Sequence, residues 1–391
     1  MIFLTSSPSQ VKDSLSTVGA MLRRYQRWMH NWEHRLTTRD TNRIVRPFEW
    51  GLEWLQDFQF RTQPRASNSD ASVRDYFFRL NEEMVERSDE FFGYQTPNDF
   101  RLEEHPIKTH QTGSNPDPKL DKKYEGKMGT FLRFTSPIKS GFAENDLANA
   151  RWFPAKGKRA MVIMPQWNSD AISHNGLGKL FNLLGVATLR LSMPYHDVRR
   201  PEGLTRADFA VSANMGRTLH ATRQGVVDIR CCMDWLEQQG YTELGVLGTS
   251  LGSCLAFVAS AHDPRIRVNI FNHASTYFGD VIWTGQATRH IREAVEKVIS
   301  QEGLRSALLG ISPMMYFDHY ERWQKKSLMI YTQYDHTFLP EFSEQIATEF
   351  RRRGTNTKVT ALPCGHYTLG ETPYKYMDAW HICRFVGSAF S

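Results

Sequence analysis

The sequence is poor in cysteine and lacks the spacings typical of a metal site. Its 391 residues include five cysteines, an odd number, and neither a C-x-x-C pair nor an H-E-x-x-H motif occurs. Such a pattern favours free thiols in a reducing environment. We therefore expect a cytoplasmic protein whose chemistry needs no metal ion and no other cofactor.

Long apolar runs are also missing. No stretch of about 18 uncharged apolar residues is present, so the sequence predicts no transmembrane segment. The first ten residues, MIFLTSSPSQ, hold a short apolar stretch without a preceding basic segment, which argues against a signal peptide. With 40% apolar and 23% charged residues, the composition is that of an ordinary globular protein.

The excess of positive charge is small and local. The formal net charge is +6, and much of it lies in residues 21–46, where arginines alternate with tryptophans. One interpretation is a surface for nucleic acid or an anionic membrane. We favour core packing and expect no nucleic-acid partner, because aromatic residues at four-residue spacing would share one inward helical face. These are Trp28, Trp32, Trp50, Trp54 and Phe58.

The pattern of the chain changes near residue 126. Residues 1–125 favour helices followed by a polar loop rich in proline, glycine and asparagine at 104–127. In 126–391, runs of β-branched and aromatic residues alternate with helical patterns, which predicts a mostly parallel sheet flanked by helices. Strands are expected at 130–137, 148–154, 159–165, 186–192, 243–248, 267–271, 327–333 and 358–363, and helices at 176–185, 212–239, 251–261, 339–354 and 373–387.

One serine lies between two glycines at the junction of a strand and a helix. In GVLGTSLGSCLA, Gly248 and Gly252 flank Ser250 at two positions on either side. An abrupt turn from strand to helix holds the central side chain at the edge of the sheet, and it brings its neighbours too close for a Cβ atom. The pattern predicts that Ser250 is a nucleophile, with the amide of Leu251 aimed at developing negative charge.

A serine nucleophile needs a base and an acid from later strand ends. Asp335 follows the expected strand at 327–333, and His366 follows the last one. We expect His366 to accept the proton of Ser250 and Asp335 to orient the imidazole. Asp280 and Asp318 are weaker alternatives for the acid.

The second oxyanion donor is expected in the loop after the strand at 159–165. The backbone amide of Trp167 is the first choice by position and that of Gln166 the second. His196 and His273 also follow expected strands, and we place both in the substrate pocket.

These motifs resemble the α/β-hydrolase superfamily over residues 130–389. The resemblance rests on Gly248-Thr249-Ser250-Leu251-Gly252, Asp335 and His366, in that order. It implies a mostly parallel sheet of eight strands and a covalent acyl-enzyme, with Ser250, Asp335 and His366 as nucleophile, acid and base. One departure is Pro165-Gln166, which replaces the His-Gly pair familiar in that loop.

Residues 276–325 form an insertion between the expected sixth strand and Asp335. In such a position we expect a small helical cap, with Trp283, Met314 and Met315 near the acyl pocket. A peripheral packing helix is the alternative interpretation of the same pattern.

The sequence thus predicts a serine hydrolase that cleaves small carboxylic esters through an acyl-enzyme on Ser250. An acyltransferase or thioesterase could use the same three residues. An alternative of another class is a non-catalytic protein that binds a partner through the basic, tryptophan-rich N-terminal helices. No motif predicts the oligomeric state.

Overall fold

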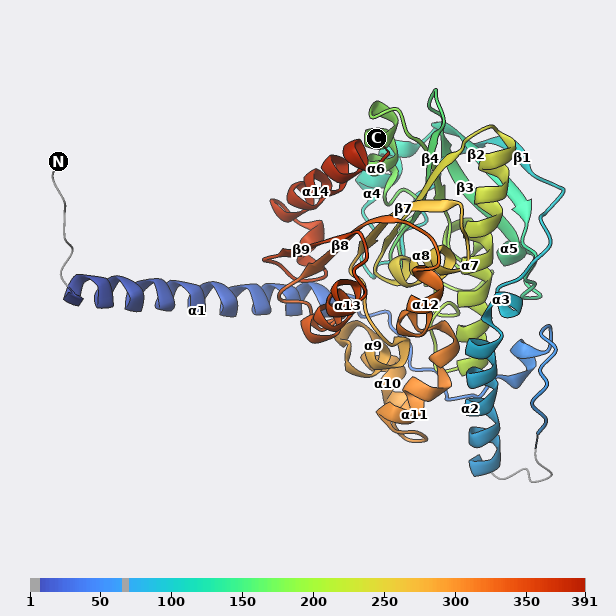
Figure 1. The fold of residues 1–391 in the computed structure, drawn as a ribbon, viewed down its shortest axis with the longest axis horizontal. Helices are drawn as coiled ribbons and strands as arrows, with labels where there is room; N and C mark the ends of the chain where they lie inside the picture. The colour runs from blue at the N-terminus through green and yellow to red at the C-terminus, as the bar shows by residue number, and fades with distance from the viewer. Residues whose placement is uncertain (1–7, 65–69, 391) are drawn as a thin grey trace.

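The computed structural model describes residues 8–64 and 70–390, which are built around one nine-stranded sheet (Figure 1). The strand order is β1-β2-β3-β5-β4-β6-β7-β8-β9. The strands are β1 (Arg101–Pro106), β2 (Met128–Thr135), β3 (Leu147–Phe153), β4 (Arg159–Met164), β5 (Ala187–Leu191), β6 (Glu243–Thr249), β7 (Ile266–Asn272), β8 (Lys326–Thr332) and β9 (Thr357–Leu362).

The sheet is parallel from β5 to β9 and antiparallel at its other end. β5, β4, β6, β7, β8 and β9 pair in parallel, whereas β1, β2 and β3 run antiparallel to their neighbours. The eight strands expected from the sequence are β2 to β9. β1 adds a ninth, at positions where we expected helix and loop. Its residues, RLEEHP, are largely charged and lie at an exposed edge, so they carry no alternating apolar signal.

Two hydrophobic layers cover the two faces of the sheet. Successive residues of β4 point to opposite layers, with Val162 in one core cluster and Met161 and Ile163 in the other. The layer of Val162 contains α7 (Met215–Gln238), α8 (Leu251–Ala261) and α13 (Pro340–Arg352), and the opposite layer contains α6 (Asn175–Leu183) and α14 (Tyr374–Ala389). Parallel strands covered on both sides hold their carboxyl ends at one common edge.

The N-terminal helices pack against this body. α1 (Pro8–Thr38) projects from it at its N-terminal end, and α2 (Asp70–Glu86) lies beside the helices of the insertion (Figure 1). The expectation of inward-facing aromatic residues is wrong for Trp28, which is 46% exposed, whereas Trp32, Trp50 and Phe58 pack against the hydrophobic clusters. On α1, Met29, Glu33 and Thr37 are the fully buried residues near Trp28. Spacing alone could not predict the buried face, because the row of Trp28 and Trp32 and the row of Met29, Glu33 and Thr37 both repeat every four residues.

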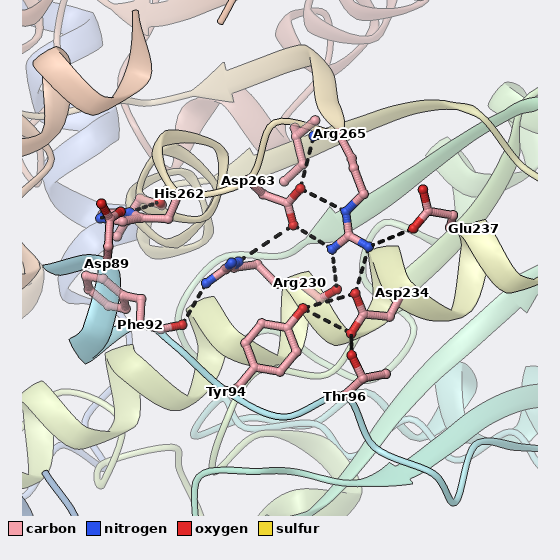
Figure 2. Close-up of polar contacts among 12 residues, drawn as sticks. Asp89, Phe92, Tyr94, Thr96, Arg230, Asp234, Glu237, His262, Asp263 and Arg265 are labelled. Carbon is pink, nitrogen blue, oxygen red and sulfur yellow. Dashed lines mark hydrogen bonds and ion pairs between the residues drawn. The ribbon is translucent and has the colours of Figure 1, made fainter. Parts of the chain in front are cut away.

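A polar network fastens residues 92–96 to α7 and the start of β7 (Figure 2). The carboxylate of Asp234 accepts hydrogen bonds from Tyr94 and Thr96 and pairs with Arg265 at 2.7 Å. Arg230 donates to the carbonyl oxygen of Phe92 at 2.7 Å. Charge-assisted bonds of this kind fix the path of the chain before β1.

The insertion between β7 and β8 is helical. It comprises α9 (Phe278–Thr284), η3 (Gln286–Thr288), α10 (Arg289–Val295), α11 (Gln301–Ala307), η4 (Leu309–Ile311), η5 (Pro313–Tyr316) and α12 (Phe317–Tyr320). The remaining short elements are η1 (Leu52–Leu55), α3 (Ser88–Phe91), α4 (Pro118–Tyr124), α5 (Ala143–Asp146), η2 (Asp197–Arg199) and η6 (Thr368–Gly370).

Two expectations from composition bear on the described residues. None of the helices in residues 8–64 and 70–390 is long and apolar enough to cross a membrane. The five cysteines are free thiols, and four of them are buried. The first seven residues, on which the expectation about a signal peptide falls, lie outside the described part of the chain.

Candidate active site

Ser250 occupies a sharp turn between β6 and α8. Its backbone adopts φ 56° and ψ −121°, in a region that residues other than glycine rarely occupy. Its amide donates to the carbonyl oxygen of Asn272 at the end of β7, at 2.8 Å. Leu251 is the first residue of α8, so its amide has no acceptor within that helix.

The two glycines beside Ser250 allow this turn. A Cβ atom on Gly248 would lie closer than 3.0 Å to the backbone of Gly252 and Ser253. A Cβ atom on Gly252 would lie equally close to the carbonyl oxygens of Met164 and Pro165. The glycines therefore let α8 begin against the end of β4, which is the reason the sequence pattern suggested.

Ser250, His366 and Asp335 lie in one hydrogen-bonded row. Nε2 of His366 is 2.8 Å from Oγ of Ser250, and Nδ1 of His366 is 2.8 Å from Oδ2 of Asp335. Because a carboxylate only accepts, Nδ1 carries the proton and Nε2 accepts from the serine hydroxyl. The structure thus brings together three side chains from the ends of β6, β8 and β9.

Asp335 is fully enclosed and held ionised. Its Oδ1 accepts from the amides of Thr337 and Phe338, each at 2.7 Å, and its Oδ2 accepts from Thr332 at 3.1 Å. Burial opposes ionisation, but the charge of His366 and the hydrogen bonds hold the pKa of Asp335 well below its usual range.

His366 is tuned in the opposite sense. Burial alone would lower the pKa of this imidazole, but the charge of Asp335 and the hydrogen bond to it raise that pKa above 6.5. Negative charge on Glu33 acts in the same direction. A proton taken from Ser250 would therefore be held more firmly than by a free histidine.

His273 and His196 have separate surroundings. The ring of His273 lies 4.2 Å from that of His366, and Nδ1 of His273 lies 3.3 Å from Asp335. Both histidines line a cavity of about 740 Å³ that also contains Ser250. His196 is buried outside that cavity, where its Nε2 accepts from the amide of Asn168 at 2.9 Å. His196 thus supports the loop after β4 and does not line the pocket, contrary to our expectation.

The loop after β4 is fixed from several sides. Gln166 and Trp167 line the cavity that contains Ser250. Trp167 donates through Nε1 to the carbonyl oxygen of Ala207 at 3.0 Å, and the amide of Ala207 donates to Oδ1 of Asn168 at 2.8 Å. A rigid loop is what a backbone oxyanion donor requires.

Two cavities reach Ser250. The larger, about 740 Å³, is open and is lined by His366, Gln166 and several charged side chains, among them Arg39 and Arg206. The smaller, about 50 Å³, is apolar and includes Leu251, Cys254, Val211, Phe278, Val281, Ile282 and Phe338. One side of the serine therefore faces polar groups and the other faces a narrow apolar pocket.

Other candidates lie away from these cavities. Trp283, Met314 and Met315 pack against the main hydrophobic cluster and are not among the described residues that line either cavity. The alternative acids have other partners, since Asp280 pairs with Arg305 and Asp318 with Arg353. Within the insertion, residues of α9 and η3, among them Val281 and Thr288, line the smaller cavity beside Ser250.

Two groups of side chains have the composition of a metal site within the described residues. One is His273, Asp335 and His366, of which Asp335 and His366 are already hydrogen-bonded to each other in the row above. The other is Asp89, His262 and His319, near the network in Figure 2. Its carboxylate already pairs with the guanidinium of Arg322 at 3.0 Å, and so has a cation beside it.

Three polar residues near the site carried no sequence signal that we recognised. Glu33 lies under the turn that follows His366, Asn168 holds the loop after β4, and Asp378 lines the larger cavity. Burial raises the pKa of Asp378 to about 7, although Asn272 donates to it at 2.9 Å. Each is an isolated polar residue in its own segment, and only the fold brings it to Ser250.

Comparison with known families and structures points to one fold. The family described as "Alpha/beta hydrolase domain containing 18" matches residues 175–300, which include β6 and Ser250. No curated protein matches the chain by sequence.

Solved structures resemble the chain over most of its length. An acetyl xylan esterase from Paenibacillus sp. R4 aligns at 14% identity and a TM-score of 0.53, covering 86% of this chain and 99% of that one. Acetyl xylan esterase 1 from Thermoanaerobacterium sp. aligns at 15% identity and 0.52, covering 88% and 100%. A Pyrococcus horikoshii acylaminoacyl peptidase aligns at 13% and 0.51, covering 66% and 41%. At these identities the likeness is one of fold.

Proposed function

We propose that the chain is an α/β-hydrolase and a serine hydrolase of carboxylic esters, acting through an acyl-enzyme on Ser250. The observation that carries this proposal is the row from Ser250 through His366 to Asp335, with both contacts at 2.8 Å. Fold alone would leave the chemistry open, because one fold hosts many activities.

The first half-reaction transfers the acyl group to the enzyme. Nε2 of His366 takes the hydroxyl proton as Oγ of Ser250 attacks the ester carbonyl carbon, and Asp335 stabilises the resulting imidazolium. The amides of Leu251 and of Trp167 or Gln166 are assigned to the oxyanion. Collapse of the intermediate breaks the ester C–O bond, and the imidazolium protonates the departing alkoxide.

The second half-reaction releases the acid. His366 deprotonates a water molecule that attacks the acyl carbon, the bond to Oγ breaks, and the proton returns to Ser250. In this scheme the apolar pocket beside α9 takes the acyl group and the open cavity takes the alcohol. The insertion 276–325 would then act as a cap through α9. We also propose that residues 1–125 form a helical extension and that residues 126–391 form the hydrolase domain.

The test is pre-steady-state hydrolysis of p-nitrophenyl acetate. We expect a burst of nitrophenolate equal to the enzyme concentration, because acylation releases the phenolate first. Ser250→Ala should abolish the burst and lower turnover roughly 10³-fold or more. Ser260→Ala is the matched control, since Ser260 is a buried serine in α8, the helix that begins directly after Ser250, and its hydroxyl has no hydrogen-bond partner among the described residues. Equal turnover by Ser250→Ala would contradict the proposal.

Esters and thioesters differ in the group that leaves during acylation, whereas hydrolysis and acyl transfer differ in the acceptor that attacks the acyl-enzyme afterwards. A thioesterase would turn over an acyl thioester in the same assay, and an acyltransferase would transfer the acyl group to an added amine or alcohol. We also propose a cytoplasmic location, because the free thiols of the described residues are typical of a reducing compartment.

A further inference from the structure

A carboxylate from the N-terminal helix is buried beneath the turn that carries His366. Glu33 lies in α1, far from His366 in sequence, and its side chain is fully buried. No lysine, arginine or histidine pairs with it within 4.0 Å among the described residues, so hydrogen bonds alone compensate its burial. Burying a charge without an opposite charge is costly unless donors surround it.

Most of the donors belong to the residues that immediately follow His366, and the hydroxyl of Thr37 on α1 adds one at 3.3 Å. The amides of Tyr367 and Thr368 each donate to the carboxylate of Glu33 at 2.9 Å, and the hydroxyl of Thr368 donates to it at 3.0 Å. The amide of Gly365 donates in turn to that hydroxyl at 2.6 Å. Glu33 therefore gathers backbone groups on both sides of His366 around one carboxyl group; burial raises the pKa of Glu33, and the amides of Tyr367 and Thr368 oppose that rise.

Gly365 makes room for this arrangement. A Cβ atom on Gly365 would lie closer than 3.0 Å to three atoms of the Glu33 side chain. The backbone before His366 therefore lies directly on the carboxylate, and any movement of Glu33 must move this turn.

The same helix contacts the other loop of the row. Nδ1 of His30 lies 2.9 Å from Nε2 of His336, the residue after Asp335, and Tyr25 donates to the carbonyl oxygen of Pro363. α1 thus spans the loops after β8 and β9, from which Asp335 and His366 project.

From these contacts we infer that Glu33 is a positioning residue, which anchors the 365–368 turn and keeps the imidazole of His366 aligned with Ser250. This inference deepens the proposed function and rests on it for its catalytic consequence. It means that α1 supports the active site and does not only pack against the outside of the domain. Glu33 acts through His366 and touches no reacting atom.

The test compares Glu33→Gln with wild type in the full-length protein. The amide keeps the shape but replaces one acceptor oxygen with an NH₂ group, which faces a donor and leaves it unpaired. We expect kcat/KM for p-nitrophenyl acetate to fall roughly 10- to 100-fold through misalignment. In the pH profile of kcat/KM, the midpoint of the acid limb should move to lower pH, because a negative charge that raises the pKa of His366 is removed.

Two further variants separate alignment from general stability. Glu83→Gln is the control, since Glu83 is a buried carboxylate on α2 that accepts from the amides of Arg61 and Thr62 at 2.7 and 2.8 Å, away from the site; unlike Glu33 it also pairs with Arg87, at 2.6 Å. It should lower the thermal midpoint and leave the pH profile unchanged. Glu33→Asp keeps the charge but withdraws it by one methylene, so it should lose rate with a smaller shift of the acid limb.

A titration of His366 by ¹³C-histidine NMR, assigned with His366→Gln, reads the contact without any turnover. A lower pKa for His366 in Glu33→Gln supports the inference, and an unchanged pKa together with kcat/KM within twofold of wild type overturns it. Equal losses in Glu33→Gln and Glu83→Gln at equal loss of thermal stability also overturn it. Wild type without turnover would refute the proposed function, while the NMR titration would still decide the role of Glu33.

Discussion

The backbone of Gly248 lies so close to that of Gly252 that a single methyl group between them would overlap the chain. Gly248→Ala should therefore displace the start of α8, lower the free energy of unfolding by about 1–3 kcal/mol, and impair turnover. Urea unfolding and ester hydrolysis measure the two effects. Gly387→Ala is the control, because no described residue outside its own helix lies within 4 Å of the added methyl group and alanine favours the helix.

Asp335 sets the pH dependence through His366. The base must be neutral to accept a proton, and its pKa is raised above 6.5, so kcat/KM should increase with pH and reach half its maximum above that value. Asp335→Asn removes the charge that raises this pKa. We expect the acid limb to move to lower pH and the maximal rate to fall about 10³- to 10⁴-fold. An unshifted limb would mean that Asp335 does not act on His366.

Asn168 holds the loop from which the second oxyanion donor is expected. Asn168→Ala removes the acceptor for the amide of Ala207, while Trp167 keeps its own bond to that residue. Loosening a preorganised donor should slow acylation by about tenfold, less than the 10²–10³ typical of deleting a donor. Stopped-flow measurement of the burst rate reports this step. An unchanged burst rate would exclude this loop from the oxyanion site.

Val281 lines the narrow apolar pocket beside Ser250. If acyl chains enter it, each buried methylene contributes about 0.8 kcal/mol, and kcat/KM should increase along short p-nitrophenyl esters. Val281→Trp fills the pocket and should flatten this increase while sparing acetate most. Val298→Trp on the same insertion is the control, since Val298 is 48% exposed. The same chain-length profile in both variants would place the acyl group elsewhere.

Local patterns predicted the parts of the site that depend on neighbouring residues. The run at 243–248 followed by small residues predicted the turn at Ser250, and the two glycines have the backbone contacts that the pattern requires. Asp335 and His366 were found because each lies just past an expected strand. Strand ends of a parallel sheet meet at one edge, so chain order alone brought these residues together.

Features that depend on packing between distant segments were missed. Glu33 looks like one more charged residue on a basic helix, and only the turn after His366 gives it donors. Trp28 of α1 was expected to face inward and is exposed for the same reason, because the partner surface decides which face is buried. β1 escaped notice since its charged side chains lie at an exposed edge, where pairing with β2 needs no apolar pattern.

The most direct measurement is peptide mapping after reaction with a fluorophosphonate, which bonds covalently to an activated serine. The account predicts one adduct per chain, located at Ser250, formed by wild type and by Ser260→Ala and lost in Asp335→Asn or His366→Gln. An adduct on another serine, or ester hydrolysis that continues at full rate in chains without a reactive Ser250, would contradict it.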